Sequence, residues 1–326
     1  MESTSPHIPP QPPGAVNALV NGFNAVANNV GLILFPVLFD VFLWLGPRLK
    51  VSDLFAPIIQ DMAQIQASVP DFPLTPQLLT EFWNSFNLFS VLRTFPLGIF
   101  SLMSANLMAS SPLGSRLEWN ISNILLALAV LLLLTFLGWL GGGFYYYSVS
   151  RVALRPEQKV NLLFSIPNSL LLSGIWALAA LVLSLPVFFA VGLLFLINQT
   201  MGLIVNLLMV LLLAWVALPV FFSLHGIFTR AQNAFVSIWQ SFRLMRYGLP
   251  SLGWFAMMAI VINQGLDILW RIPPAESWMA LVGILGHAFV STSLLAASFI
   301  YYRDMQTWVE AALTWLKTNR IPSARA

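Results

Sequence analysis

Long apolar runs, separated by short polar clusters, make up most of this sequence. The hydrocarbon core of a bilayer is about 30 Å thick and takes about 20 helical residues to cross, so runs of about that length with few charges predict membrane spans. The pattern therefore predicts an all-α, polytopic transmembrane helical bundle. Six spans are predicted, at about residues 30–46, 121–147, 168–197, 201–228, 250–270 and 278–302.

The middle of the chain decides the number of spans. No Asp, Glu, Lys or Arg occurs from Val160 to Thr229, a stretch too long for one span. Its polar cluster, Asn198-Gln199-Thr200, predicts a turn between two spans. A further break at Pro186 would leave only Val187 to Ile197, which is too short to cross, so we expect six spans rather than seven.

Composition agrees with a membrane protein. Hydrophobic residues make up 58% of the chain and charged residues 8%, with a mean hydropathy of +0.82, whereas soluble chains carry about a quarter charged residues. The chain has no cysteine, and its histidines, His7, His225 and His287, lack the spacing of metal ligands, so no metal or cofactor is expected. The Lys and Arg residues flank apolar runs, where they mark orientation and do not imply nucleic-acid binding.

The distribution of Lys and Arg predicts the orientation. With six spans, ten Lys and Arg residues lie on the side of the two termini and five on the other side. Because basic loops stay in the cytosol, both termini are predicted to be cytoplasmic. A seven-span chain with an outer N-terminus divides these residues eleven to four, so the charges alone leave that alternative open.

Each pair of spans shows a similar pattern. Amphipathic pieces precede the pairs, namely "NALVNGFNAVANN", "NLLFSIPNS" and "NAFVSIWQSFRLMRYG", and each pair ends in an aromatic cluster with arginine, namely "FYYYSVSR", "FFSLHGIFTR" and "FIYYRDMQ". Aromatic rings favour the headgroup level and guanidinium groups favour water, so such ends are typical of helices that leave the bilayer. We expect three helical hairpins with interfacial lead-in helices; the alternative is that all helix ends on the inner face look alike.

The longest connection, residues 47–120, is the most individual part of the chain. A helix is predicted from near Ser52, and Thr75-Pro76, a capping residue followed by proline, predicts the start of another. The apolar piece at 95–114 is bounded by prolines and too short to span, so we expect it to be interfacial or re-entrant. Together these pieces form a helical outer cap that offers a surface to a protein partner; the alternative is a lipid-facing amphipathic belt.

Three regions follow from this map. Residues 1–14 are rich in proline and polar side chains, which predicts a disordered cytoplasmic tail. Residues 15–306 are expected to form a single transmembrane domain, and residues 307–326 an amphipathic cytoplasmic helix and tail.

Two carboxylates interrupt the apolar runs, Asp40 before Trp44 and Asp267 before Trp270. An acid at the centre of a spanning helix costs about 2.5–3.5 kcal/mol, so each needs a partner or a shallow position. If both tryptophans mark the outer interface, the acids lie about 5–6 Å below it. We expect Asp40 to pair with Arg271 and thereby to dock the first hairpin against the third.

Asp267 is expected to pair with Arg48 or Arg93 in the same way. The alternative is a polar intramembrane site for an ion or a substrate, formed by Asp40, Asp267, His287, Gln264, Asn263 and Arg271.

The last pair of spans, from "SIWQSFRLMRYG" to "FIYYRDMQ", also carries a family resemblance. With Phe242-Arg243 and Tyr302-Arg303-Asp304, residues 205–304 resemble the membrane domain attached to some bacterial glycerophosphodiester phosphodiesterases and related uncharacterised bacterial membrane families. The resemblance implies a six-helix architecture in a prokaryotic cytoplasmic membrane. The loops offer no clustered carboxylates and histidines, so the catalysis of that family is not carried over.

The motifs of common enzyme classes are missing from this sequence. It has no phosphate-binding Gly-rich loop with lysine, no paired-histidine zinc helix and no Gly-x-Ser-x-Gly elbow, so we expect no catalytic residues. The expected function is a non-catalytic accessory or scaffolding subunit whose partner binds residues 47–120. The alternative is a transporter or channel for a small solute or lipid that uses Asp40 and Asp267.

Overall fold

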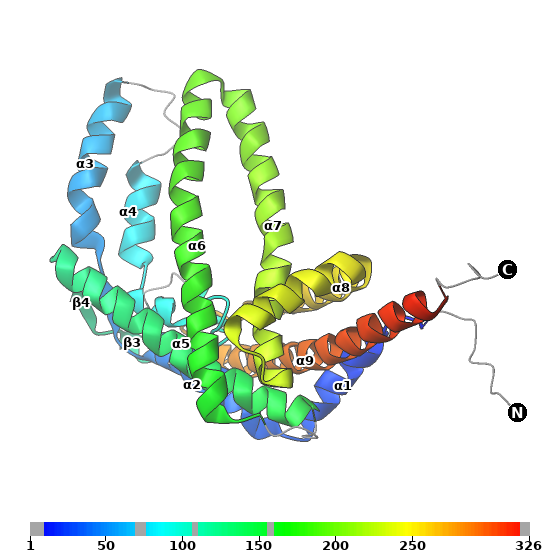
Figure 1. The fold of residues 1–326 in the computed structure, drawn as a ribbon. Coiled ribbons are helices and arrows are strands. Elements are labelled where there is room, and N and C mark those ends of the chain that lie inside the picture. The colour runs from blue at the N-terminus through cyan, green and yellow to red at the C-terminus, as the bar shows by residue number, and fades with distance from the viewer. Residues whose placement is uncertain (1–9, 69–75, 106–109, 155–159, 320–326) are drawn as a thin grey trace, which may run out of the picture. The chain divides into compact units, whose positions relative to one another are not determined.

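The computed structural model describes residues 10–68, 76–105, 110–154 and 160–319, and these are almost entirely helical (Figure 1). The α-helices within them are α1 (Ala15–Ala27), α2 (Leu34–Leu45), α3 (Ser52–Ser68), α4 (Pro76–Ser85), α5 (Ile124–Leu154), α6 (Leu162–Ile197), α7 (Gln199–Arg230), α8 (Ala234–Trp270) and α9 (Ala280–Asn319). Short 3₁₀ turns lie at Val30–Ile33, Leu88–Leu92 and Met103–Ala105. Short strands are β1 (Arg48–Lys50), β2 (Ser110–Ser111), β3 (Gly114–Ser115) and β4 (Glu118–Asn120). The expectation of an all-α fold is confirmed.

Five helices, α5 to α9, are long and apolar enough to cross a membrane, so the chain is a multi-pass membrane protein. A sixth span is counted only if α1 and the segment Val30–Leu45 together form one. The predicted first span at 30–46 differs from the structure, because α2 has 12 residues and is only about 18 Å long at 1.5 Å per residue. That helix alone is too short for the hydrocarbon core.

The chain divides into two compact units. Unit 1 comprises residues 1–28, 147–261 and 293–326, and unit 2 comprises residues 29–146 and 262–292. The boundaries fall inside α5, α8 and α9, so each of these helices contributes to both units. The single domain expected at 15–306 stays a prediction, and most of the tail expected at 1–14 lies outside the described residues.

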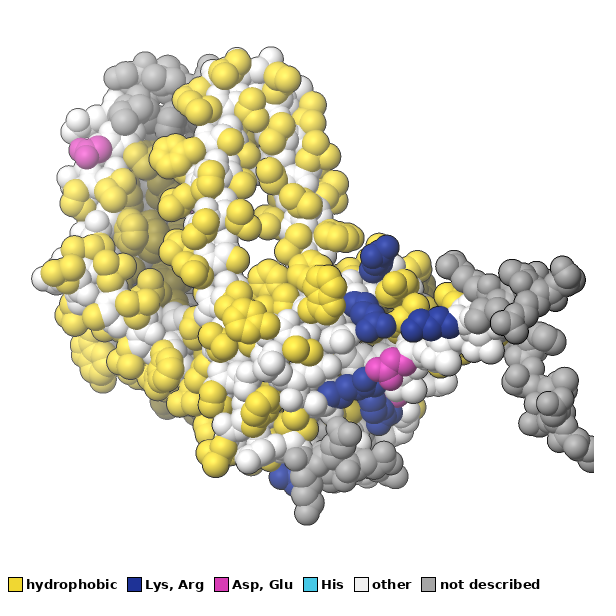
Figure 2. All heavy atoms as spheres, in the orientation of Figure 1, with side chains coloured by type: hydrophobic (Ala, Val, Ile, Leu, Met, Phe, Trp, Pro, Cys, Tyr) yellow, Lys and Arg dark blue, Asp and Glu magenta, His cyan; other side chains and the backbone are white. Residues whose placement is uncertain are grey.

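The α6–α7 hairpin belongs to unit 1, and its two helices lie side by side (Figure 1). The turn predicted at Asn198 is confirmed: the Asn198 side chain accepts a hydrogen bond of 3.1 Å from the backbone N–H of Met201, which caps α7. From residue 174 to residue 218, Gly202 is the one buried residue of the hairpin and the others are half-buried or exposed, and Figure 2 shows hydrophobic side chains covering it. Each exposed arm has about 20 residues and is about 30 Å long, which matches the thickness of a bilayer core.

Two of the three predicted lead-in helices are not separate elements. The first corresponds to α1, but the second and third are the N-terminal ends of α6 and α8, which run on without a break. Prolines inside these helices, Pro167 and Pro250, do not end them, since the surrounding turns keep their own hydrogen bonds. The C-terminal helix expected at 307–326 is likewise the continuation of α9 to Asn319.

The aromatic clusters expected at the membrane interface are buried inside the protein. In unit 2, the Tyr145 and Tyr146 side chains are fully covered. In unit 1, Tyr301 stacks on Phe255 with ring centroids 4.3 Å apart, and Tyr302 is equally buried. These rings gain contact by packing against one another, and their level relative to the bilayer stays a prediction.

The segment 47–120 contains the helices predicted for it, α3 and α4, which pack against each other. Phe55 stacks on Trp83 with ring centroids 3.5 Å apart and planes 9° from parallel. Strand β1 pairs in parallel with β4, which places Arg48 opposite Glu118. The helix α4 begins at Pro76 as predicted, and Thr75 lies outside the described residues.

The described part of the piece at 95–114 packs within unit 2. Leu97 and Leu102 are completely buried, and α5 meets this piece at a glycine contact. A Cβ atom at Gly142 would lie 2.7 Å from the Cα of Gly98, so this position requires glycine. These residues of the piece thus pack against protein, and its interfacial or re-entrant position stays a prediction.

Candidate functional site

Asp40 holds the piece around residue 102 against α2. Its carboxylate accepts hydrogen bonds from the Ser101 hydroxyl at 2.5 Å, from the backbone N–H of Leu102 at 3.0 Å and from that of Met103 at 2.9 Å. The Asp40 side chain has no exposed surface. These bonds satisfy the acid without a cation, and they supply an acceptor for the N–H groups at the start of the 3₁₀ turn.

Arg271 reaches the same piece from a different side. Its guanidinium donates to the backbone carbonyl of Leu102 at 3.1 Å. The predicted ion pair between Asp40 and Arg271 is therefore wrong, although both side chains bind residue 102. The sequence could not show that Asp40 binds backbone N–H groups, because any backbone N–H group that the fold brings close to a carboxylate can replace a guanidinium as its donor.

Asp267 pairs with His287, with 2.8 Å between Oδ1 and Nδ1. The predictions of Arg48 or Arg93 as its partner are wrong, since Arg48 bonds to Glu118 and Arg93 to Ser104. The Nε2 atom of His287 is buried and has no hydrogen-bond partner among the described residues. Gln264 does not join this group, because its side chain is exposed on α8.

Four of the side chains predicted to form the polar site belong to unit 2, namely Asp40, Asp267, His287 and Arg271. Asp40 and Arg271 both bind residue 102, and Asp267 and His287 form a second pair in the same unit. The tryptophan taken as a marker of the outer interface, Trp44, is buried instead. Its Nε1 donates to the carbonyl of Ala275 at 2.7 Å. The depth estimated for Asp40 from this tryptophan therefore has no support.

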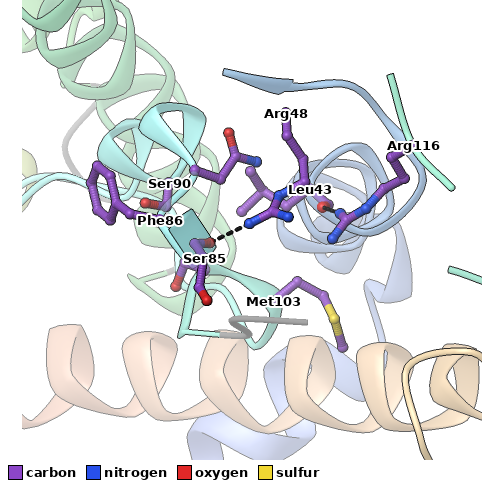
Figure 3. Close-up of a pocket in the computed structure, with 9 residues that line it drawn as sticks. Leu43, Arg48, Ser85, Phe86, Ser90, Met103 and Arg116 are labelled. Carbon is purple, nitrogen blue, oxygen red and sulfur yellow. Dashed lines mark hydrogen bonds between the residues drawn. The ribbon is translucent and has the colours of Figure 1, made fainter. Parts of the chain in front are cut away.

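A second polar region, at the end of α2, was missed by sequence reasoning. It is an open hollow lined by Leu43, Arg48, Ser85, Phe86, Asn87, Ser90, Met103, Ser104 and Arg116. In Figure 3, Arg48 and Arg116 enter it from one side, and Phe86, Ser85 and Ser90 lie on the other. The spacing of apolar residues does not predict this hollow, because its lining residues come from four separate stretches of the chain.

Hydrogen bonds position the two guanidinium groups of this hollow. Arg48 is 1% exposed, donates to Glu118 at 3.1 Å and also donates to the carbonyl of Ser85. Arg116 donates to the carbonyl of Leu43 at 2.7 Å. Burial lowers the pKa of Arg116, and the neighbouring positive charge of Arg48 lowers it further, while Glu118 acts in the opposite sense. Arg116 nevertheless stays charged at neutral pH.

Glu118 bridges two cations beside the hollow. It binds Arg48 and also Lys50, whose Nζ lies 2.5 Å from Oε2. Burial acts to raise the pKa of Glu118, but the hydrogen bond and charge of Lys50, aided by Arg48, outweigh it and bring the pKa below 4.5.

In unit 1, His225 lies fully buried among aromatic rings. Its Nδ1 is 3.1 Å from the carbonyl of Phe221, and its Nε2 is 2.8 Å from the hydroxyl of Ser298. A carbonyl only accepts, so Nδ1 carries the proton, and Nε2 faces the Ser298 hydroxyl, which also lies 2.7 Å from the carbonyl of Leu295 as a donor. With both ring nitrogens engaged, this histidine serves packing.

Among the described residues, no group of three or more His, Asp or Glu side chains could hold a metal ion. The polar regions of unit 2 consist of hydrogen-bonded acids and cations, and their geometry suits fixing of the chain and binding of an anion. No protein-family model, curated protein or solved structure matches this chain.

Proposed function

We propose that this chain is a non-catalytic accessory or scaffolding subunit that binds a partner protein through the α3–α4 hairpin. In this proposal it has six spans, with α1 and α2 forming the first, and it resides in a prokaryotic cytoplasmic membrane with both termini in the cytosol. The segment 47–120 then lies on the outer side as a cap. The family resemblance described above motivates the choice of membrane.

One observation carries the proposal. The α3–α4 hairpin exposes large apolar side chains, with Ile58 53%, Leu78 62% and Phe82 44% exposed, although neither helix is a candidate span. Exposed apolar surface outside the membrane-crossing helices is characteristic of contact sites for a protein or for the membrane surface, and we propose the protein partner.

The base of the hairpin is rigid, which favours binding. Besides the Phe55–Trp83 stack, Trp83 and Phe86 pack on a buried cluster that includes Leu88 and Leu134 of α5. A surface held in place before binding loses little conformational entropy when the partner docks.

The distribution of basic residues supports the proposed orientation. All Lys and Arg residues predicted to be outside, Arg48, Lys50, Arg93, Arg116 and Arg271, belong to unit 2. Those predicted to be cytosolic are the more numerous, ten against five.

Site-specific photo-crosslinking in intact cells tests the partner surface. A photoreactive amino acid at Leu78 or Phe82 is expected to yield a discrete protein adduct. The matched control is Leu185, which is 56% exposed on the α6–α7 hairpin and should yield lipid adducts only. Lipid adducts alone at Leu78 and Phe82 would mean that α3 and α4 form a belt on the bilayer, which would refute the proposal.

Cysteine labelling tests the orientation separately, and the chain offers a clean background because it has no cysteine. An impermeant maleimide applied to intact cells is expected to label Gln60→Cys in α3, and to label Arg246→Cys in α8 only after lysis. Both positions are exposed. The reverse pattern would place the cap in the cytosol.

A second candidate function, transport of a small solute or lipid, is favoured by the Asp267–His287 pair. A buried imidazole with one nitrogen bonded to an acid and the other without a partner among the described residues suits proton exchange. In proteoliposomes this hypothesis expects pH-dependent uptake that Asp267→Asn removes and that the exposed-site variant Gln264→Ala retains. Equal uptake by wild type and Asp267→Asn would exclude it.

A further inference from the structure

The hollow at the end of α2 concentrates positive charge. Most of the basic residues of unit 2 line it or connect to its lining through hydrogen bonds, namely Arg48, Arg116, Arg93 and Lys50. These bonds connect two carboxylates to the lining, that of Glu118 and that of Asp40, which accepts from the backbone N–H of Met103. The group therefore keeps an excess of positive charge that a bound anion would balance.

The lining has the chemistry of an oxyanion site. Guanidinium groups donate in a planar fork that matches phosphate oxygens. The hydroxyls of Ser90 and Ser104 and the amide of Asn87 add short polar groups around them. Arg48 and Arg116 are close enough to repel each other, so an anion between them would relieve that repulsion as well as bond to both.

The size of the hollow limits the ligand. Its free space is about 330 Å³ including the open mouth, but the enclosed part holds little more than one water-sized group. A whole metabolite does not fit inside. One or two oxygens of a phosphate can enter while the remainder of the molecule stays at the mouth.

The position of the hollow fits a phosphate near a membrane. Arg48 follows the end of α2 at Leu45 by three residues, and Arg116 precedes the start of α5 at Ile124. Both arginines therefore lie close in sequence to a helix end, and α5 is one of the candidate membrane spans.

We infer that the hollow lined by Arg48 and Arg116 binds a phosphate group, supplied either by an anionic phospholipid headgroup or by a soluble phosphate. This inference does not depend on the proposed scaffolding function, since it concerns a different surface from the exposed side chains of α3 and α4. Bound phosphate would hold the strand pair β1–β4 to the turn at residues 85–90 through ligand bonds.

The test uses the purified full-length chain in detergent with two probes. The first is inorganic phosphate, compared with chloride at equal ionic strength and read as a shift in thermal unfolding. The second is phosphatidic acid, compared with phosphatidylcholine and read as lipid retained in native mass spectrometry. A response to phosphate indicates a soluble ligand, and selective retention of phosphatidic acid alone indicates a headgroup.

Three variants make the test specific to the hollow. Arg116→Gln removes one guanidinium and is expected to weaken binding of the responding probe about tenfold or more. Ser90→Asp places a carboxylate in the hollow, which should occupy the guanidinium groups and abolish the response. The matched control, Arg243→Gln, removes an exposed arginine of α8 that does not line the hollow, and it should bind as wild type does.

Ser90→Asp keeps the inference testable if Arg116→Gln does not fold, because it leaves the hydrogen bonds of Arg116 to the carbonyls of Leu43 and Trp44 in place. Wild-type protein that responds to neither probe would overturn the inference. A Ser90→Asp variant that folds and responds as wild type does would overturn it equally.

Discussion

Removal of the Asp40 carboxylate should loosen the piece around residue 102 by a predictable amount. Asp40→Ala leaves three donors without their acceptor, namely the Ser101 hydroxyl and the backbone N–H groups of Leu102 and Met103. A buried polar group that loses its partner costs about 1–3 kcal/mol. Because such costs do not simply add, we expect a local loss of about 3 kcal/mol, at the lower end of the sum.

Hydrogen exchange measured by mass spectrometry is the most direct assay of this loss. Local opening that becomes easier by about 3 kcal/mol speeds amide exchange about a hundredfold, and the effect should be confined to peptides that cover residues 101–103. Ser101→Ala removes one of the three hydrogen bonds and should give a smaller effect. The control is Asp53→Asn, which changes an exposed acid of the same unit.

The double variant Asp40→Ala/Ser101→Ala separates this contact from general destabilisation. If the two side chains act through one hydrogen bond, the double variant should lose less than the sum of the single losses. Unchanged protection at residues 101–103 in Asp40→Ala would refute the reasoning, since it would mean that these amides have other acceptors.

The remaining predictions concern charge and close packing. The lowered pKa of Glu118 means that its contribution to stability is present above pH 4.5 and is lost as the pH falls through the folded-state pKa. Thermal unfolding measured from pH 7 downward should show this loss in the wild-type protein. An equal pH dependence in Glu118→Gln would contradict it. Gly142→Ala should lower the unfolding temperature, because its Cβ would lie 2.7 Å from a neighbouring backbone atom, whereas Gly141→Ala, with a nearest contact of 3.5 Å, should be tolerated. Gly22→Ala in α1 should destabilise unit 1, since its Cβ would lie 2.5 Å from a backbone nitrogen of α9. Gly253→Ala has open space around its Cβ and should be neutral or stabilising. Equal unfolding temperatures of the two variants within either glycine pair would count against the close packing.

The membrane-crossing helices and the helices of the segment 47–120 could be predicted because their causes are local. An apolar run of sufficient length favours a helix in lipid wherever it occurs, since each backbone group finds its partner within four residues. The turn at Asn198 and the helix starts at Ser52 and Pro76 likewise depend on a few adjacent residues. Helix lengths were less predictable, because α6 and α8 include the lead-in helices that the sequence pattern predicted as separate elements.

The partners of the polar side chains could not be predicted from local pattern. Asp40 was correctly singled out as an acid that needs stabilisation, but its donors lie more than 60 residues away, and two of them are backbone N–H groups that every sequence offers equally. Tyr145 and Tyr301 were assigned to the membrane interface because their type is common there, and packing buried them.

By itself, the sequence determined that this chain is a helical membrane protein, where most of its long helices run and which few acids need stabilising, because hydropathy and capping act over neighbouring residues. Only the tertiary structure decided that Asp267 binds His287, that Arg48 and Arg116 share one hollow, and which aromatic rings are buried. Those outcomes depend on contacts between distant parts of the chain, where many polar and aromatic groups compete for the same partners and the packing of the helices selects among them.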